Sequence, residues 1–112
     1  MARNYAIKVK RNSPNVMFIH SALFEIAPKE LAKYRKDCKM WAGYAQKAKG
    51  FIRYFTVKRM GYKNQYASVY KWQEKKDHDR FMRTLHDWLV SKSTAKVTVL
   101  GYYNLNTIQE IE

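Results

Sequence analysis

His20 is the side chain of this sequence best placed to exchange protons inside a folded core. It lies midway along the run NVMFIHSALFEIA at 15–27, whose β-branched and aromatic residues predict a strand covered on both faces. Residues of its own parity are Phe18, Ala22 and Phe24, so burial would make the neutral imidazole a base, a hydrogen-bond donor or an axial ligand. A core histidine with a satisfied hydrogen bond is the alternative interpretation.

His86 is the second candidate for proton transfer. It lies in the tetrapeptide LHDW, near the end of a helix predicted over 75–90, where the helix dipole favours a cationic ring. We take His20 and His86 as the candidate catalytic residues and leave the choice between them open. His78 is expected to be a solvated or half-buried residue of the same helix, and the three histidines match no metal-ligand spacing.

A flat organic molecule is the kind of ligand that the aromatic residues would bind. Several large rings could wall a pocket, and Arg53 could meet an anionic group on the ligand. Ser21 has the opposite parity to His20 and would line whichever cavity His20 does not. For any single ring, an ordinary place in the core is the simpler interpretation. The candidate ligand-binding residues are Ser21, Arg53, Tyr54, Tyr70 and Trp72.

Several reaction classes lack their sequence signatures. The chain has no glycine-rich phosphate loop, no GxSxG motif and no Cys-His pair in a suitable local context, so nucleotide-dependent and acyl-transfer chemistry have no support. The single cysteine, Cys38, cannot form an internal disulfide and is expected to be buried and inert. No bound metal is expected, and the protein is expected to be cytoplasmic.

The composition is that of one small, basic, folded domain. The 112 residues are 46% hydrophobic and carry 22 Lys and Arg against 9 Asp and Glu, a net charge of +13. Neither a signal sequence nor a membrane span is expected, because no apolar run is long enough. The basic residues come singly or in pairs, as on the solvated faces of folded elements. We therefore expect weak, salt-dependent binding to nucleic acid and no specific nucleic-acid partner.

The periodicity describes a single domain, 1–112, in which residues 1–14 form an N-terminal edge strand and turn before a core at 15–108. Pro28 opens the first helix and Gly50 ends it. Gly101 indicates a bulge in the last strand. The predicted core elements are a strand at 15–27, a helix at 28–50, strands at 51–60 and 66–72, a helix at 75–90 and a strand at 97–108.

This order of elements predicts an α+β fold. A β-α-β-β-α-β chain forms the ferredoxin-like split βαβ arrangement, an antiparallel four-stranded sheet with both helices on one face. In the strands at 15–27 and 51–60, large side chains point to both faces of the sheet, so the face without helices also needs a cover. A second copy of the sheet is the physical expectation, which makes the protein a homodimer.

The order of these elements and three local motifs resemble the antibiotic biosynthesis monooxygenase (ABM) domain of the dimeric α+β barrel superfamily. The motifs are a long strand leading to Pro-Lys-Glu at 28–30, the sequence KGF at 49–51, and a Trp that ends the third strand before a helix (VYKWQEKKDHDRFMRTLHDWLVSKS). The spacing from Trp72 to His86 is similar to that in a small uncharacterised bacterial branch. The resemblance spans residues 15–108.

The resemblance implies a homodimeric barrel with a ligand pocket between sheet and helices in each protomer. Members include cofactor-free oxygenases of polyketide phenols and haem-degrading monooxygenases. The haem-degrading branch carries an Asn on the first strand and, on the second helix, a Trp followed ten residues later by a His. Here Thr98 stands ten residues after Trp88, Met82 stands ten after Trp72, and the first strand has His20-Ser21 at its middle.

The predicted function is that of an ABM-type monooxygenase acting on a small flat organic substrate, without a bound metal or other cofactor. Arg53, Tyr54 or Trp72 would stabilise a phenolate or enolate, and His20 or His86 would accept a proton. The alternatives are a non-catalytic ligand-binding protein of the same fold and a haem-binding or haem-degrading homologue. A basic nucleic-acid-binding module is the least favoured alternative. The expected partners are a second copy of the chain and a small organic ligand, with no membrane association.

Overall fold

Four strands and two long helices follow one another in the predicted order in a computed structural model, which describes residues 16–112. The expected edge strand and turn at 1–14 lie outside the described residues. The elements are β1 (Phe18–Glu25), the single 3-10 turn η2 (Pro28–Glu30), α1 (Leu31–Ala45), β2 (Phe51–Lys58), β3 (Gln65–Trp72), α2 (Lys75–Lys92) and β4 (Thr98–Asn106). Neither long helix has the length and apolar character needed to cross a bilayer.

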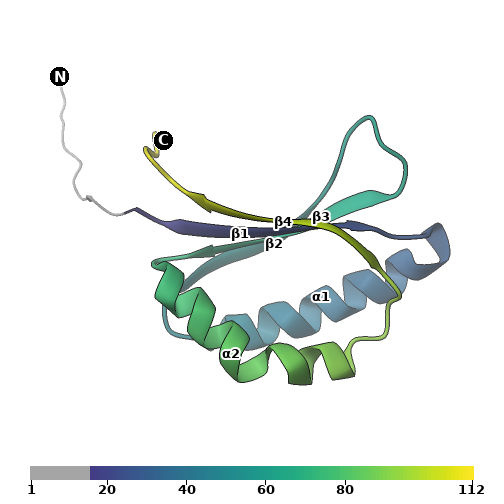
Figure 1. Cartoon of the computed structure of the whole chain (residues 1–112), viewed down its shortest axis with the longest axis horizontal. Helices are drawn as coiled ribbons and strands as arrows, with labels where there is room; N and C mark the ends of the chain where they lie inside the picture. The colour runs from purple at the N-terminus through teal and green to yellow at the C-terminus, as the bar shows by residue number, and fades with distance from the viewer. Residues whose placement is uncertain (1–15) are drawn as a thin grey trace.

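The strands form one antiparallel sheet in the order β2-β3-β1-β4, and both helices pack against the same face of it (Figure 1). This is the ferredoxin-like arrangement, so the predicted fold class is confirmed. β1 lies between β3 and β4, with His20 opposite Tyr70 on one side and Asn104 on the other. The pairing of β1 with β4 shifts after Leu23, beside Gly101, where the sequence indicates a bulge.

The first helix is shorter than its sequence signals indicate. Pro28 opens only a 3-10 turn, and α1 begins at Leu31 and ends at Ala45. Two of the next three amides bond to carbonyls three residues back, which tightens the chain beyond the helix. The chain then reverses at Gly50, whose φ of +85° suits glycine, and a Cβ there would overlap the carboxylate of Asp77.

Two clusters of buried side chains hold the helices on the sheet. The larger cluster centres on Trp72, which is fully buried with Phe81 and Leu89 of α2. The smaller cluster joins Tyr34 and Cys38 of α1 to the end of β1, so the expected burial of Cys38 is confirmed. Full burial of each large apolar side chain stabilises the fold by roughly 2 kcal/mol.

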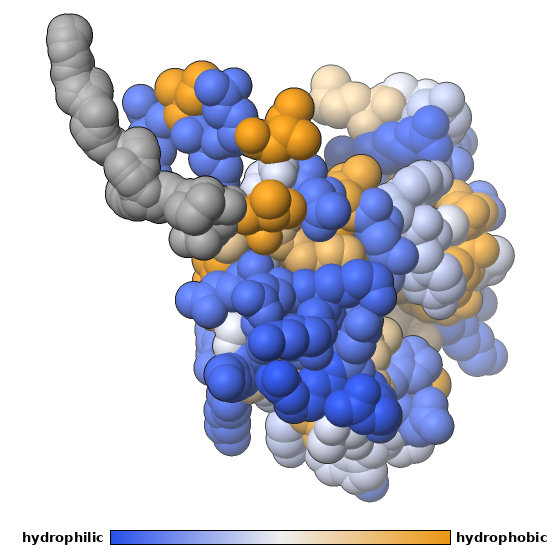
Figure 2. All heavy atoms as spheres, turned by 60° about the vertical axis from the view of Figure 1, so that its left-hand side comes forward, coloured by the Kyte–Doolittle hydropathy of each residue, from blue (hydrophilic) through white to orange (hydrophobic). Residues whose placement is uncertain are grey.

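The sheet face that points away from the helices is partly apolar and has no cover within residues 16–112. On the two edge strands, Phe55 is 41% exposed, Tyr103 48% and Leu105 52%. Figure 2 shows hydrophilic residues gathered over the helical side of the molecule, while hydrophobic residues reach the surface beside the sheet. We call this second face, which includes Phe55, Val57, Tyr103 and Leu105, the open sheet face.

Candidate active site at His20 and His78

His20 lies on the helix-facing side of β1, and a side chain of the neighbouring strand fixes its ring. The residue is 8% exposed, and its Nδ1 atom lies 2.8 Å from Oδ1 of Asn104, which stands opposite it in β4. An amide oxygen only accepts hydrogen bonds, so the proton of the neutral imidazole is on Nδ1 and the lone pair is on Nε2. His20 is thus a buried base whose acceptor nitrogen is not the one bonded to Asn104.

His78, in the first turn of α2, packs directly against His20. The two ring centroids are 4.4 Å apart. Burial, followed by repulsion from His20, lowers the pKa of His78 to about 4, so this imidazole is neutral at pH 7. The expectation of a solvated or half-buried His78 is wrong. The side chain is 7% exposed because the first turn of α2 lies on the sheet, where Phe18 and Trp72 also contact it.

Within residues 16–112, two buried side-chain nitrogen atoms have no hydrogen-bond partner, and both belong to this region. They are Nδ1 of His78 and Nε1 of Trp72, whose ring centroids are 6.0 Å apart. Leaving a polar group buried without a partner costs about 1–3 kcal/mol. Such groups are concentrated at sites that bind or react, which marks this part of the core as the candidate active site.

The edge strand β4 is the most exposed part of the sheet next to the imidazole pair. Most residues of β1 and β3 are buried or half-buried, whereas nearly every residue of β4 is exposed. Tyr102 stacks on His20 with 5.9 Å between the ring centroids, yet it is 60% exposed. The exposed Tyr102 ring thus lies between the buried imidazole of His20 and the surface of the molecule.

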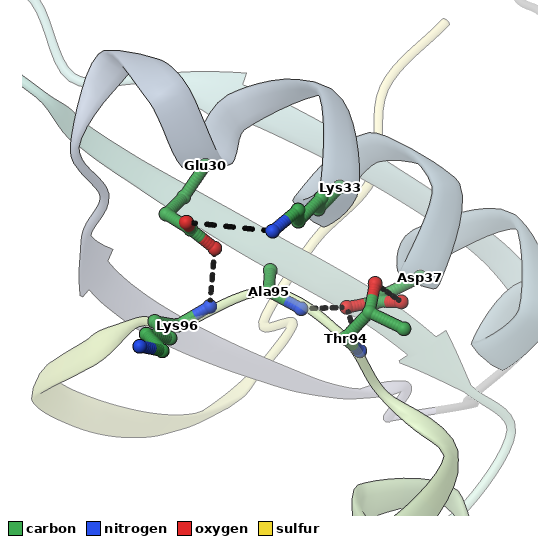
Figure 3. Close-up of polar contacts among 6 residues, drawn as sticks. All are labelled: Glu30, Lys33, Asp37, Thr94, Ala95 and Lys96. Carbon is green, nitrogen blue, oxygen red and sulfur yellow. Dashed lines mark hydrogen bonds and ion pairs between the residues drawn. The ribbon is translucent and has the colours of Figure 1, made fainter.

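Two buried carboxylates hold the loop that leads into β4 (Figure 3). Asp37 accepts hydrogen bonds from the amides of Thr94 and Ala95, at 2.9 and 2.8 Å, and from the Thr94 hydroxyl at 3.1 Å. Glu30 accepts one from the Lys96 amide at 2.8 Å, and this bond lowers the pKa of the Glu30 carboxyl. The carboxylates therefore fix the start of β4 and, with it, the side chains that face the imidazole pair.

A second cluster of polar side chains in the core consists of three hydroxyl groups that bond to one another. The Oγ atom of Ser68 on β3 lies 2.5 Å from the hydroxyl of Tyr34 and 3.0 Å from that of Tyr54. Burial raises the pKa of both tyrosines, so both remain protonated phenols. Because each hydroxyl has a partner, we interpret this cluster as support for the core, in contrast to the unpaired nitrogen atoms around His78.

Three of the candidate ligand-binding residues share the helix-facing side of the sheet with His20. Tyr70 pairs with His20 across the strands, and its ring centroid lies 6.5 Å from that of the imidazole. Trp72 is the residue whose Nε1 atom is unpaired beside His78. Tyr54 lies farther away on β2, with its ring against Tyr70.

The other candidates lie elsewhere. Ser21 points to the open sheet face, as its parity implies, and so does Arg53, whose guanidinium lies 5.6 Å from the centroid of the Phe55 ring. His86 lies on α2, with its Nδ1 3.1 Å from Asp87 and its ring edge-on to Trp41. The structure thus does not bring Ser21, Arg53 or His86 together with His20.

Sequence reasoning missed the two closest partners of His20. Asn104 is 84 residues away along the chain, and His78 lies in a different element, so no local pattern joins them. One sequence signal could have placed Asn104. It stands two residues after Tyr102, and residues two apart in a strand point to the same side of the sheet. Within residues 16–112, no three His, Cys, Asp or Glu side chains gather into a metal-binding group.

Comparison with known proteins shows similarity of fold. No protein-family model matches this chain, and no curated protein matches it significantly. Three solved structures of proteins provisionally assigned as antibiotic biosynthesis monooxygenases do match. The one from Deinococcus radiodurans has a TM-score of 0.68 at 11% identity, over 85% of this chain and 96% of that one.

The other two matches agree with the first. The protein from Nitrosomonas europaea gives a TM-score of 0.66 at 10% identity, over 83% of this chain and 89% of its own. The protein from Bordetella bronchiseptica gives 0.65 at 15% identity, over 84% of this chain and 99% of its own. At such low identity the matches establish the fold alone, and the chain accordingly has the fold of the antibiotic biosynthesis monooxygenase domains.

Proposed function

We propose that this protein is an ABM-type monooxygenase that oxidises a small flat organic molecule with dioxygen and without a bound metal. The observation that carries the proposal is the hydrogen bond between His20 Nδ1 and Asn104 Oδ1, 2.8 Å long, which leaves Nε2 of a buried imidazole as a proton acceptor. The shared fold supports it further, since the matched structures include proteins provisionally assigned to this activity.

The first step is removal of a proton from the substrate. A flat phenol stacked beside Tyr102 gives up its hydroxyl proton to Nε2 of His20, and the resulting imidazolium keeps its Nδ1 proton on Asn104. His78 stays neutral, because its pKa is about 4, so the charged His20 has no second cation against it. The Nε1 proton of Trp72 is a donor without a partner in the same region.

The second step is oxidation of the electron-rich phenolate by dioxygen. For a phenol with an activated CH2 group, one oxygen atom becomes the carbonyl oxygen of the product. The other leaves as water with the two hydrogens of that group. The substrate supplies all four electrons that dioxygen accepts, so no further reductant is required. The protein contributes the base, the orientation of the ring and a partly dry environment.

The proposed assembly is a homodimer joined through the open sheet faces. Phe55, Val57, Tyr103 and Leu105 lie on strands that have helices on the other face only, and each is more than two-fifths exposed. A two-fold axis would place this apolar patch against its own copy and remove it from water. The His20 site faces the helices of its own chain and stays outside this contact.

The experiment that tests the function is oxidation of a panel of tricyclic phenols and hydroquinones under 18O2. We expect oxygen uptake with one substrate class, one 18O atom in the product, and no loss of rate after exhaustive dialysis against a chelator. A product whose new oxygen comes from water would contradict the proposal, as would a rate that disappears with the chelator and returns with a metal. Absence of oxygen uptake over the whole panel would favour the non-catalytic ligand-binding alternative.

A further inference from the structure

The outward side of α1 and its flanks carries a row of cations. All six are exposed, and they lie at spacings that keep them on the side of the helix opposite its buried residues. We define the basic face of α1 as Lys29, Lys33, Arg35, Lys36, Lys39 and Lys47.

No exposed carboxylate balances this face. The two acidic residues in this part of the chain, Glu30 and Asp37, are both buried and are bonded to the loop before β4. Among the six cations, only Lys33 makes an ion pair within residues 16–112, at 3.8 Å from Glu30. The basic face therefore presents almost its full charge to solvent.

Several cations of α2, unlike most of those of α1, are paired with acidic neighbours. Lys75 bonds to Asp79 at 2.8 Å, and Arg80 bonds to Asp77 at 3.2 Å. On α1, by contrast, Arg35 and Lys39 stand four residues apart with like charge, which weakens a helix. Helix stability thus gives no reason for the basic face, and an anionic partner does.

The chemistry of the face selects among anionic partners. An amphipathic helix binds a lipid surface most strongly when apolar side chains enter the membrane, and no large hydrophobic side chain between residues 27 and 50 is exposed. The face has no exposed aromatic ring on which an unpaired base could stack. It presents instead Arg35, Lys36 and Lys39 close together on an open surface, which suits phosphate groups that need no enclosing pocket.

We propose that the basic face of α1 binds the phosphate backbone of double-stranded nucleic acid without regard to sequence. α1 has 15 residues and is therefore about 22 Å long, so its cations can meet several phosphates of a duplex at once. Lys and Arg contacts to phosphate fix position and carry no base information. This surface lies on the outside of the helical layer, away from the open sheet face, so it remains accessible in a dimer joined through the sheets.

The test compares two triple variants that remove the same charge. One replaces Arg35, Lys36 and Lys39 by Gln. The matched control replaces Lys58, Arg59 and Lys63 by Gln, which are equally basic and exposed but lie at the loop between β2 and β3. Fluorescence anisotropy of a labelled 24-base-pair duplex gives the affinity between 25 and 200 mM salt, and circular dichroism checks that each variant is folded.

We expect wild-type binding to weaken steeply with salt, in the same way for two duplexes of unrelated sequence. The α1 variant should bind at least tenfold more weakly at the lowest salt, with a salt slope smaller by roughly two to three units, at about 0.9 per lost phosphate contact. The loop variant should keep the wild-type slope. If the α1 variant does not fold, the Lys36→Gln, Lys39→Gln double variant takes its place.

Three results would overturn the proposal. Equal losses in the two triple variants would show that only net charge matters. Wild-type affinity that does not depend on salt would show that phosphate contacts do not drive binding. Tighter binding to vesicles rich in phosphatidylserine than to the duplex would assign the face to a lipid surface.

Discussion

The ring centroids of His20 on β1 and His78 on α2 are 4.4 Å apart. Of the two imidazoles, only that of His20 has a side-chain hydrogen bond that fixes the position of its proton. The two rings therefore differ in role although they share one environment. Asn104 defines the tautomer of His20 and makes it a base, whereas burial and the nearby His20 keep His78 neutral. The pair links the sheet to the helix that covers it, so its protonation affects stability as well as chemistry.

Acid should destabilise the protein through His78. The unfolded chain binds a proton at the usual histidine pKa of about 6.5, and the folded chain binds it only near 4, so the free energy of unfolding falls as the pH drops through that window. The full effect is roughly 3 kcal/mol. We expect urea denaturation of His78→Phe to show a smaller loss between pH 6.5 and 4.5 than the wild type, whereas His86→Gln should lose as much as the wild type. An unchanged pH dependence in His78→Phe would contradict this assignment.

The loop before β4 should depend on the charge of Asp37. Asparagine offers one acceptor oxygen where the carboxylate accepts three hydrogen bonds, and its NH2 group would face the amides of Thr94 and Ala95. We expect Asp37→Asn to lower the free energy of unfolding by about 2 kcal/mol. Asp87→Asn, at an exposed position of α2, is the control and should change it by less than about 0.5 kcal/mol. Equal effects of the two substitutions would contradict the anchoring role.

Ser68 should be needed for stability. Its replacement by alanine leaves the hydroxyls of Tyr34 and Tyr54 in the core without their partner. Each unpaired hydroxyl costs about 1–3 kcal/mol, so we expect Ser68→Ala, which leaves two of them, to lower the free energy of unfolding by roughly 2–6 kcal/mol. Ser21→Ala, on the open sheet face, is the matched control with a small expected effect. A Ser68→Ala variant as stable as this control would show that the cluster adds nothing to the core.

The open sheet face should join two copies of the chain. Light scattering at micromolar concentration should give twice the protomer mass of 13.4 kDa. Leu105→Glu, in the apolar patch, should shift the mass to that of the monomer, whereas Met60→Glu, in the exposed loop before β3, should not. A single monomer mass for the wild type would refute the proposed assembly.

The fold could be predicted because its signals are local. The order of elements follows from the runs of β-branched and aromatic residues in the strands, the apolar stripe of each helix and the residues at the turns. Gly50 lies at the turn and Gly101 at the bulge that the sequence indicates. The ends of elements were predicted less well. Proline favours the first position of either kind of helix and does not decide between α-helical and 3-10 hydrogen bonds. The chain therefore forms a 3-10 turn at Pro28, where the sequence predicts the first turn of an α-helix.

The candidate site could be predicted only in part, because its contacts join distant segments. The parity of β1 placed His20 among buried side chains. Nothing near His20 in the sequence indicates that Asn104 will hold its ring, or that the first turn of α2 will bring His78 against it. Arg53 was expected near the ligand, but the register shift between Phe51 and Arg53 turns it to the open sheet face.

The rate of oxygen uptake by His20→Gln and His86→Gln, with the best substrate of the panel, tests the central claim most directly. If His20 is the base, His20→Gln should lower kcat by about 10²–10⁴-fold with a smaller change in KM. Asn104→Ala should lower kcat less and change its pH profile, because Asn104 acts only through the tautomer of His20. Wild-type kcat in His20→Gln, or a large loss in His86→Gln alone, would contradict the account.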